Sequence, residues 1–519
     1  HGADARLEVE RLDLPGSTLA AHLNYRPDAN SLALYAHGKE APGGLVARIA
    51  GLPPGPPVSL DVQGDGPLDN WRATFSLNAS DSPFVAGAMT IDRVATGYGF
   101  SAQMEGFLDS IAPKGWQGLL SGKTTVQARG KRTASGLIVI DAAAISNDAL
   151  RFSGAGEYHP DKNELTGKAH LDIARQDGHP IPLPVQGDVP SSIASLDVVL
   201  DLPAADTAKP ATLVVSARSI AIAAGSASQL DAHGEVTRSS NRLIDGPFEI
   251  TATLQGLTNA DAPIANAVGD KAAFSASGEL ASAGRAVLRN LALRMANASI
   301  EGSGTLDSGK FKGQVQARAA DLAPFLKLAR IDAAGGATLD AQGIVGLDGT
   351  TLDVALSGAS PSLSLTETNS ARRELGAVSF SFKANRDNGG PLSVRGAEIT
   401  SRSLKARGYV TIGDAKVDGE AHADLSDLST ISGKAEGAVA LSAKLGGTFD
   451  DMQSALVAQG RAIRLAGRSF TDVVARLEGK GPIKRHVVQA SIDAIATGQP
   501  FAARSQITLG ADALAFDSV

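Results

Sequence analysis

The segment Ser121-Gly122-Lys123-Thr124 comes nearest, by residue type, to a chemical motif in this chain. A Gly-Lys-Thr sequence of this kind ends a phosphate-binding loop, which cradles nucleotide phosphates, when an earlier glycine opens the loop and a helix follows it. Here Gln117 occupies the position of that earlier glycine, and the residues after Thr124 alternate as a strand does. A glycine turn that leads into a strand therefore explains the segment better than a phosphate-binding loop.

Three aspartates, Asp61, Asp65 and Asp69, lie around Gly64 and Gly66 and could offer oxygen ligands to calcium. A calcium loop of the helix–loop–helix type also needs a 12-residue frame that a glutamate closes, and this segment has none. The Gly-x-Gly pairs of the chain lack the third glycine of a dinucleotide fingerprint. Strand ends with glycine turns account for these pairs, which stand at 64/66, 97/99, 154/156 and 302/304.

The 9 histidines are scattered, none has the His-Glu-x-x-His spacing of a zinc hydrolase, and the chain has no cysteine. We therefore expect no catalytic residue, no metal site and no cofactor, and we predict that the protein is not an enzyme. On the same grounds, substitution of Lys123 or of any single histidine is expected to leave function intact.

Composition limits the partners. With 48 Lys and Arg against 55 Asp and Glu, the net charge is −7 without long runs of one sign, so we expect no nucleic-acid partner. The strongest apolar run, 137–140, is far shorter than the ~18 residues of a membrane-spanning helix. The chain starts at His1 and shows no signal peptide, so we expect it to be a piece of a longer protein.

The segment Gly313–Gly343 is the unit from which the chain is built. It opens with period-2 alternation, which predicts a half-buried strand. From Leu322 the apolar residues follow helical spacing through Phe325, Leu326 and Ala329, with Asp321 at the N-cap position and Pro324 in the first turn. A glycine pair at 335–336 then ends this short helix, and a second strand follows.

This strand, short helical turn and strand unit recurs in degenerate form. Similar segments run from Phe100 to Gly130, from Ile250 to Gly278 and from Glu420 to Gly446. Their spacing is irregular, yet repetition of this kind favours a stacked, repetitive architecture over one compact core. Aromatic residues make up only 4% of the chain and Gly accounts for 57 of 519 residues, which suits many short strands joined by glycine turns.

Period-2 patterns recur along the whole chain and predict an all-β fold. The clearest hairpin joins 58–62 to 71–77 across a Gly-Asp-Gly-Pro turn. Further strands are expected at 6–14, at 19–35 (two strands around Pro27), 84–91, 97–104, 137–145 and 165–173, and a stiff proline connector at 53–57. We treat residues 1–519 as one elongated β-repeat segment, with a possible joint near 175–195, where the chain is rich in proline.

One set of apolar positions stands in phase through the second half of the chain. If the strands lie side by side, these residues line one continuous interior and are the candidate groove-lining residues. They are Val315, Ala317, Leu352, Val354, Leu356, Val378, Phe380, Phe382, Val410, Ile412, Val439, Leu441 and Leu445. They fill the core of a closed solenoid such as a parallel β-helix, or they line an open trough for acyl chains. The residue pattern alone leaves both alternatives open.

The repeated unit resembles the long periplasmic portion of the TamB family, which belongs to the AsmA-like group of bacterial envelope proteins. The resemblance rests on 320–326 followed by Gly335-Gly336, on 58–68 and on 300–306, and it extends over essentially the whole chain. It implies an elongated, curled, taco-like β-sheet with short helical turns and a hydrophobic groove. The family has no catalytic residues to carry over.

The resemblance also implies location and partners. Proteins of this family are anchored in the inner membrane, lie in the periplasm and reach the outer membrane, where TamB works with the barrel protein TamA in the translocation and assembly module. They are implicated in phospholipid transport and in outer-membrane biogenesis. The inner-membrane anchor lies outside this chain, and we do not recognise the family's C-terminal domain in it.

We therefore expect bridge-like lipid transfer, in which phospholipid acyl chains pass along a hydrophobic groove between the two membranes of a Gram-negative bacterium. A first alternative is a scaffold that assembles outer-membrane proteins such as autotransporters by strand addition. A second is a closed β-solenoid protein that acts on polysaccharide. The 2 Trp and 5 Tyr offer few rings for sugar stacking, which counts against the second alternative.

Overall fold

The computed structural model of the chain contains two units. Unit 1 comprises residues 1–260 and 270–275, and unit 2 comprises residues 261–269 and 276–519. The structure describes residues 2–10, 17–42, 57–79, 82–109, 112, 115–184, 191–205, 207, 209–222, 225–238, 245–258, 265, 268–281, 285–328, 332–366, 372–482, 485–510 and 514–518. The expected strand end at 11–14, the connector at 53–56 and the helix position Ala329 lie outside these residues.

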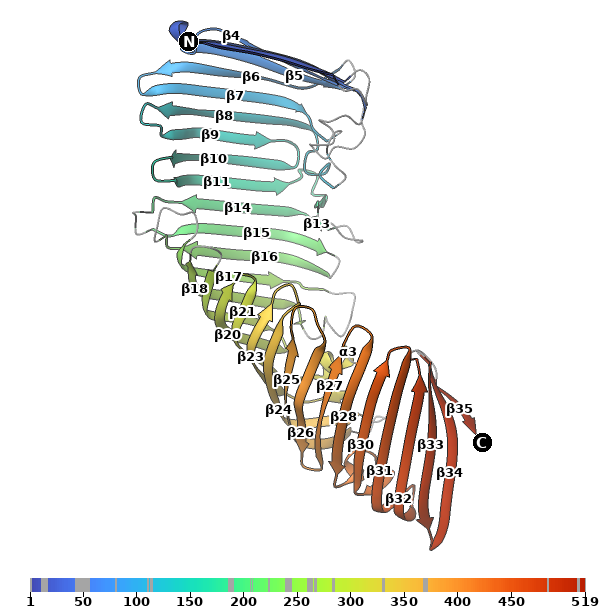
Figure 1. Cartoon of the computed structure of the whole chain (residues 1–519). Helices are drawn as coiled ribbons and strands as arrows, with labels where there is room; N and C mark the ends of the chain where they lie inside the picture. The colour runs from blue at the N-terminus through green and yellow to red at the C-terminus, as the bar shows by residue number, and fades with distance from the viewer. Residues whose placement is uncertain are drawn as a thin grey trace. The chain divides into compact units, whose positions relative to one another are not determined.

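Unit 1 is an antiparallel sheet whose strands follow one another in chain order (Figure 1). β11 pairs directly with β14, and the short β12 and β13 lie in the connection between them. The strands are β1 (Ala3–Glu10), β2 (Thr18–Arg26), β3 (Ser31–Glu40), β4 (Val58–Asp65), β5 (Asn70–Ala79), β6 (Ser82–Val94), β7 (Gly97–Phe107), β8 (Lys123–Thr133), β9 (Ile138–Ser146), β10 (Leu150–His159), β11 (Glu164–Ala174), β12 (Ile181–Pro182), β13 (Ser192–Ile193), β14 (Ser195–Leu202), β15 (Ala211–Ile222), β16 (Gly225–Val236) and β17 (Gly246–Gln255).

Unit 2 is built in the same way, and β18 (Lys271–Ala281) is divided between the two units. Its strands are β19 (Arg285–Met295), β20 (Ala298–Asp307), β21 (Lys310–Ala319), β22 (Ala333–Ala334), β23 (Ala337–Gly346), β24 (Leu352–Thr366), β25 (Arg372–Arg386), β26 (Leu392–Ser401), β27 (Leu404–Ile412), β28 (Lys416–Leu425), β29 (Ala435–Gly437), β30 (Val439–Thr448), β31 (Asp451–Leu465), β32 (Arg468–Gly481), β33 (Arg485–Ala496), β34 (Gln499–Gly510) and β35 (Leu514–Ser518).

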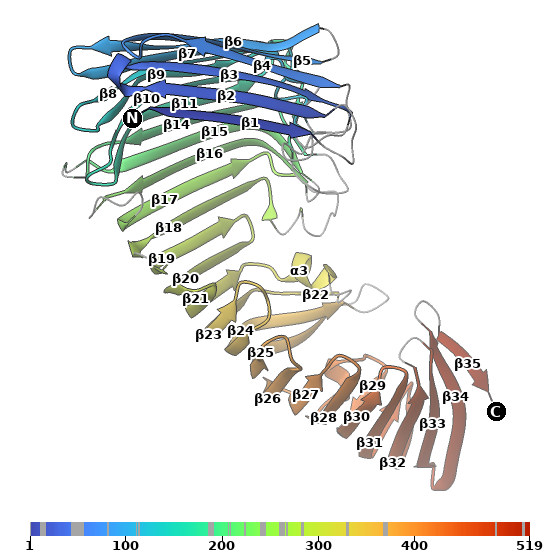
Figure 2. The same cartoon turned by 45° about the horizontal axis from the view of Figure 1, so that its top comes forward.

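The sheet of each unit is open. Within the described residues β1 pairs only with β2, and β35 pairs only with β34. The unit 1 sheet is also curled: β4 and β5 are seen on edge in Figure 1 where β8–β16 are seen face-on, and Figure 2 brings β1–β4 to the front. The predicted all-β, curled, repetitive sheet is therefore confirmed. The alternative of a closed parallel solenoid is wrong, because successive strands pair antiparallel and the sheet does not close on itself.

The predicted strand, helix and strand unit is present. β21 is followed by the short helix α3 (Ala323–Leu328), by β22 and by β23. The Asp321 carboxylate accepts hydrogen bonds from the backbone N–H of Ala323 at 2.9 Å and of Gly335 at 3.4 Å. It thus caps the helix start, as expected of this residue type, and also ties the returning chain to that start.

Two of the four predicted copies, Gly313–Gly343 and Glu420–Gly446, share a structural form with the connection between β11 and β14, which was not predicted as a copy. In each of three connections a short strand bypasses the next long strand and pairs with the one after it: β13 with β15, β22 with β24, and β29 with β31. Because strands alternate in direction, the connections that follow β7 and β11 lie on the same side of the unit 1 sheet, along the strand ends. The connections that follow β21 and β28 likewise lie on one side of the unit 2 sheet. At the opposite strand ends of each sheet, mostly short turns join the strands, such as 95–96 and 308–309.

The main buried cluster of unit 1 lies beneath these long connections. Leu119, Ile181 and Ile193 come from the connections and pack with Ile173 and Ala217 of the sheet. Ile181 is fully buried. The joint expected near 175–195 stays a prediction. In the structure, β11 and β14 pair directly across this segment, and the boundary between the two units lies at 260–276.

Candidate functional site

The two faces of the unit 2 sheet differ in chemistry. Residues directly opposite each other on neighbouring strands point to the same face, so the register assigns each side chain. One row runs Val315, Ala341, Leu356 and Phe382 across β21, β23, β24 and β25. We call the face that carries this row the apolar face, and the other the polar face.

The register places every candidate groove-lining residue on this apolar face. Ala317, Leu352, Val354, Val378 and Phe380 flank the row already described. Further along the unit the same face carries the candidates Val410, Ile412, Val439, Leu441 and Leu445. A second row runs Val410, Gly419, Leu445, Ser454, Gly479, Val488 and Ile507 across β27, β28 and β30–β34.

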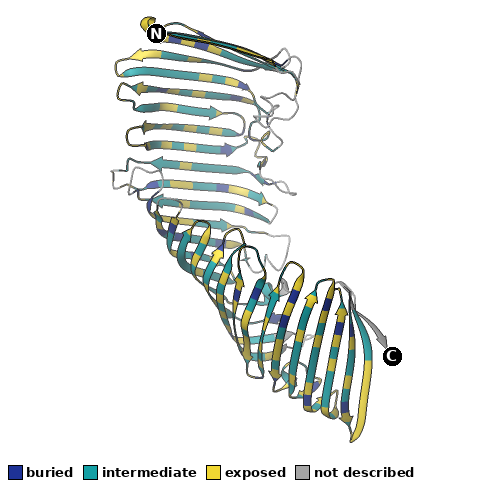
Figure 3. Ribbon diagram, in the orientation of Figure 1, coloured by how far each residue is buried: buried dark blue, intermediate teal, exposed yellow. Residues whose placement is uncertain are grey.

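None of these candidates is buried. All are intermediate in exposure except Ile412, which is 42% exposed. Figure 3 shows the same condition along the unit 2 strands, where fully buried positions are few. Within the described residues, the Val, Leu, Ile and Phe side chains of this face are thus only partly covered, which is uncommon in a soluble sheet.

The sheet of unit 1 has an apolar face of the same kind. Its register groups Leu7, Ala21, Ala36 and Val62 across β1–β4, and Leu171, Val198 and Val215 across β11, β14 and β15. Large side chains on this face remain open to solvent, with Leu7 51% and Leu213 42% exposed. The long connections cover the face only at one edge, through the cluster around Ile181.

Aromatic rings on the apolar faces lie over glycines of the same face. A Cβ placed on Gly87 would lie 2.4 Å from the Phe75 ring, and one placed on Gly64 would lie 2.6 Å from the Trp71 ring. The same relation joins Phe311 to Gly313 in unit 2, at 2.7 Å. Rings that occupy the space of a missing side chain project less from the sheet, so the face is smoother than its aromatic content suggests.

The polar faces carry cross-strand ion pairs that are exposed to solvent. Lys123 Nζ lies 2.9 Å from Glu105, and Lys168 Nζ lies 2.8 Å from Asp201. Lys123 is thus the first residue of β8 and not part of a phosphate loop. Seven of the described histidines also lie near carboxylates: His22, His37, His159, His170, His179, His233 and His422.

The aspartates considered for calcium do not converge. Asp61 pairs with His37 at 2.5 Å, whereas Asp69 accepts a hydrogen bond from Asn30 at 2.8 Å. Within the described parts of the chain, no group of three or more His, Cys, Asp or Glu side chains is placed to hold a metal ion. In the same parts, no helix has the length and apolar character needed to cross a membrane.

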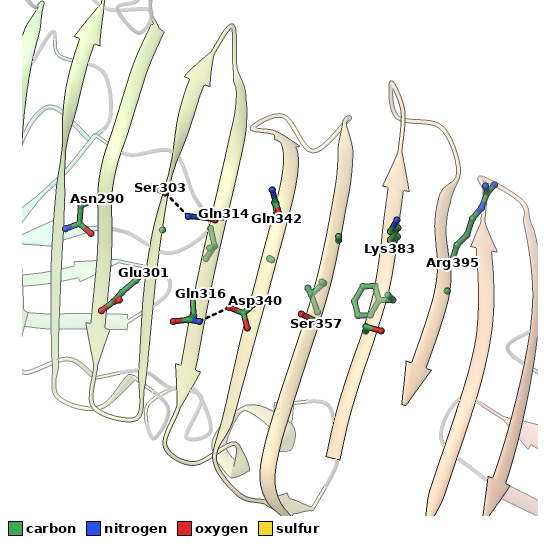
Figure 4. A pocket seen from close by; sticks show the side chains of 18 of the residues that line it. Asn290, Glu301, Ser303, Gln314, Gln316, Asp340, Gln342, Ser357, Lys383 and Arg395 are labelled. Atoms are coloured by element: carbon green, nitrogen blue, oxygen red, sulfur yellow. Dashed lines mark hydrogen bonds between the residues drawn. The ribbon is translucent and has the colours of Figure 1, made fainter. Parts of the chain in front are cut away.

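A polar hollow of about 840 Å³ lies on the polar face of unit 2 (Figure 4). Gln316 donates to Asp340 at 2.7 Å across its floor, and Gln314 donates to Ser303 at 3.4 Å. Lys383 and Arg395 stand opposite each other at one side of it. The side chains that the polar face contributes are amides, hydroxyls and charges of both signs, which offer an acyl chain no favourable contact. Val315, Leu356 and Phe382 of the apolar face also belong to the lining.

An apolar hollow of about 480 Å³ lies on the other face of unit 2, over β27–β34. Val410, Leu445, Leu456, Leu477, Val488 and Ile507 line it. Two polar side chains of the apolar face, Ser454 and His486, also belong to its wall, and they form a hydrogen bond of 2.8 Å. His486 is only 4% exposed.

Sequence reasoning missed this polar pair. Ser454 stands in phase with Met452 and Leu456, and His486 stands in phase with Val488. The available signal was a polar residue at a position where the period-2 alternation predicts an apolar one. The expectation that any single histidine can be replaced without effect therefore has to be revisited for His486.

The pKa of the Asp427 carboxyl is held below its usual value, chiefly by hydrogen bonds from Ser429. Its carboxylate accepts from the backbone N–H of Ser429 at 2.9 Å and so caps the short helical turn Leu428–Thr430. This turn occupies the place of α3 in the fourth copy of the repeated unit. The Asp427 carboxylate therefore has a structural role in this connection, because it holds the helical turn in place.

Comparison with family models, with curated proteins and with solved structures found no match to this chain.

Proposed function

We propose that this chain is a lipid-conducting segment whose apolar face carries the acyl chains of phospholipids. The observation that carries the proposal is that, among the described residues of each unit, a face lined by aliphatic and aromatic side chains is covered only in part. Burial of apolar area contributes roughly 25 cal/mol per Å², or ~0.8 kcal/mol for each CH₂ group. A long acyl chain on this face thus gains enough free energy to leave water.

The arrangement of the faces suits movement along the sheet. The lining has small aliphatic side chains and rings that lie over glycines, so a chain meets few projecting groups. Polar side chains are rare on the apolar face, so few hydrogen bonds hold a head group at one place. Head groups would stay in water at the strand ends that short turns join, away from the strand ends that the long connections cover.

The setting follows from the sequence resemblance to the TamB family and is proposed with it. We place the segment in the periplasm of a Gram-negative bacterium, within a protein anchored in the inner membrane. A TamA-like barrel is the partner at the outer membrane. The phospholipids would pass between the two membranes without chemical change, so the function needs neither catalytic residues nor a cofactor.

The direct test is lipid loading of two adjacent variants in β30. Leu441→Asp places a carboxylate on the apolar face, whereas Ala440→Asp places one on the polar face of the same strand. We expect extracted phospholipid, measured by mass spectrometry, to fall several-fold in Leu441→Asp and to be unchanged in Ala440→Asp. Both variants should fold, because an uncovered face can hydrate the new charge.

Thermal melting of the two variants provides the control. Wild-type protein without bound lipid, or equal loading of the two variants, would count against lipid conduction. In that case strand addition to client outer-membrane proteins becomes the better account, since it uses sheet edges and not the apolar face.

A further inference from the structure

The apolar hollow of unit 2 contains a polar pair whose hydrogen bonds can be assigned. His486 Nδ1 lies 3.2 Å from the backbone carbonyl of Gly481, and a carbonyl can only accept. Nδ1 therefore carries the proton of the neutral ring. Nε2 is then an acceptor, so the Ser454 hydroxyl donates to it across the 2.8 Å contact.

The pair meets across an intervening strand. Ser454 lies in β31 and His486 in β33, and Gly479 of β32 lies between them. A Cβ placed on Gly479 would come 2.3 Å from His486 Nε2 and 2.4 Å from Ser454 Oγ. The missing side chain of Gly479 is thus the space in which the two side chains join.

The surroundings of the pair are apolar. The charged residues at the hollow, Glu420 and Lys444, point to the polar face, where their side chains pair at 3.6 Å. The other side chains toward the pair are aliphatic, among them Leu445, Leu456 and Val488. An apolar hollow with one placed polar group is the usual form of a site for a small amphiphile.

We propose that this hollow binds one long-chain fatty acid, with its carboxyl group at Ser454 and its hydrocarbon chain along the aliphatic wall. The proposal rests on the proposed function, because it names a single-chain ligand for the same apolar face. The chemistry of the pair selects the ligand. Ser454 Oγ gives its hydrogen to His486 and keeps lone pairs, so it accepts from a ligand hydroxyl.

A carboxyl group fits the pair in both protonation states. As the neutral acid, it donates its O–H to Ser454 Oγ. As the carboxylate, it accepts a hydrogen bond from the Ser454 hydroxyl, which then turns from His486 to the ligand. An ester carbonyl can only accept and competes with His486 for the Ser454 proton, and an alcohol lacks the ionised state.

Three ligands of equal chain length test the proposal on the full wild-type chain: palmitic acid, methyl palmitate and hexadecanol. We expect palmitic acid to bind about tenfold more tightly than either of the others, measured by displacement of a fluorescent fatty acid. Equal binding of palmitic acid and either analogue would overturn the carboxyl site and leave acyl-chain binding intact. Binding of none of the three would overturn the proposed function as well.

Variants locate the preference. His486→Leu should lower the ratio of palmitic acid affinity to methyl palmitate affinity about tenfold, because it also frees the Ser454 hydroxyl to donate to the ester carbonyl. Ser454→Ala, which removes a single oxygen, is the second variant in case the first fails to fold. The control is His422→Leu, because His422 pairs with Glu420 on the polar face. An unchanged ratio of acid to ester in folded Ser454→Ala and His486→Leu would overturn the assignment.

Discussion

The ring of Phe380 in β25 lies over Gly358 in β24, its direct partner in the antiparallel ladder. A Cβ placed on Gly358 would come 2.5 Å from Phe380 Cζ, too close for the ring to keep its position. Glycine at this position therefore keeps a large candidate groove residue low on the apolar face.

Replacement of Gly358 by Ala should destabilise unit 2 by about 1–3 kcal/mol, the usual cost of overpacking, and push the Phe380 ring outward. Urea unfolding followed by circular dichroism measures the loss. Gly446→Ala is the control, since nothing lies within 4 Å of a Cβ at this polar-face position. Equal stability of the two variants would show that the ring does not depend on Gly358.

Trp71 is the main buried aromatic residue on the apolar face of unit 1. It is 1% exposed, and its Nε1 donates to the Leu32 carbonyl at 2.8 Å. Trp71→Ala should cost about 3–5 kcal/mol of unfolding free energy. Trp71→Phe keeps most of the apolar area and should cost less, because it loses one hydrogen bond and part of the ring. Losses of the same size in both would contradict this division, as measured by urea unfolding.

Asp321 supports the start of α3 and the returning chain at Gly335. Asp321→Ala should weaken this connection by about 1 kcal/mol, whereas Asp321→Asn keeps a capping oxygen and should change little. Hydrogen exchange of the Ala323 and Gly335 amides reports the effect locally. Unchanged protection in Asp321→Ala would contradict the capping role.

Acid should loosen the turn at Leu428–Thr430. The folded-state pKa of Asp427 is lowered, so its contribution to stability is present above its unfolded pKa of about 3.9 and is lost as pH falls through the folded pKa. Protection of the Ser429 amide, corrected for intrinsic exchange, should therefore fall from pH 5 to pH 3. In Asp427→Asn the fall should be smaller, and an equal fall would assign it to another group.

Much of the fold could be predicted from the sequence because a strand has a period of exactly two residues in its side-chain directions. Alternation at Leu352, Val354 and Leu356 fixes a face, and the antiparallel partners extend that face from strand to strand. The capping role of Asp321 was also readable, because Asp before a helical stripe and a glycine pair after it are local signals.

The pairing of strands was not predictable in the same way. Ser454 and His486 meet because β31, β32 and β33 adopt one register and because residue 479 is a glycine. The choice between an open sheet and a closed coil also depends on pairing direction, which alternation does not encode. The two units divide near 260–276, and this segment is no richer in proline or glycine than the segment at 178–184. Proline and glycine content therefore did not predict the division.

The central claim is that acyl chains lie on the apolar face and not on the polar one. Site-specific photo-crosslinking along β30 tests it most directly, with a photoreactive residue placed in turn at Ala440, Leu441, Ser442 and Ala443 in cells that carry labelled phospholipid. The account predicts lipid adducts at Leu441 and Ala443, whose side chains share the apolar face, and few at Ala440 and Ser442. Adducts of equal yield at all four positions, or none at Leu441, would contradict it.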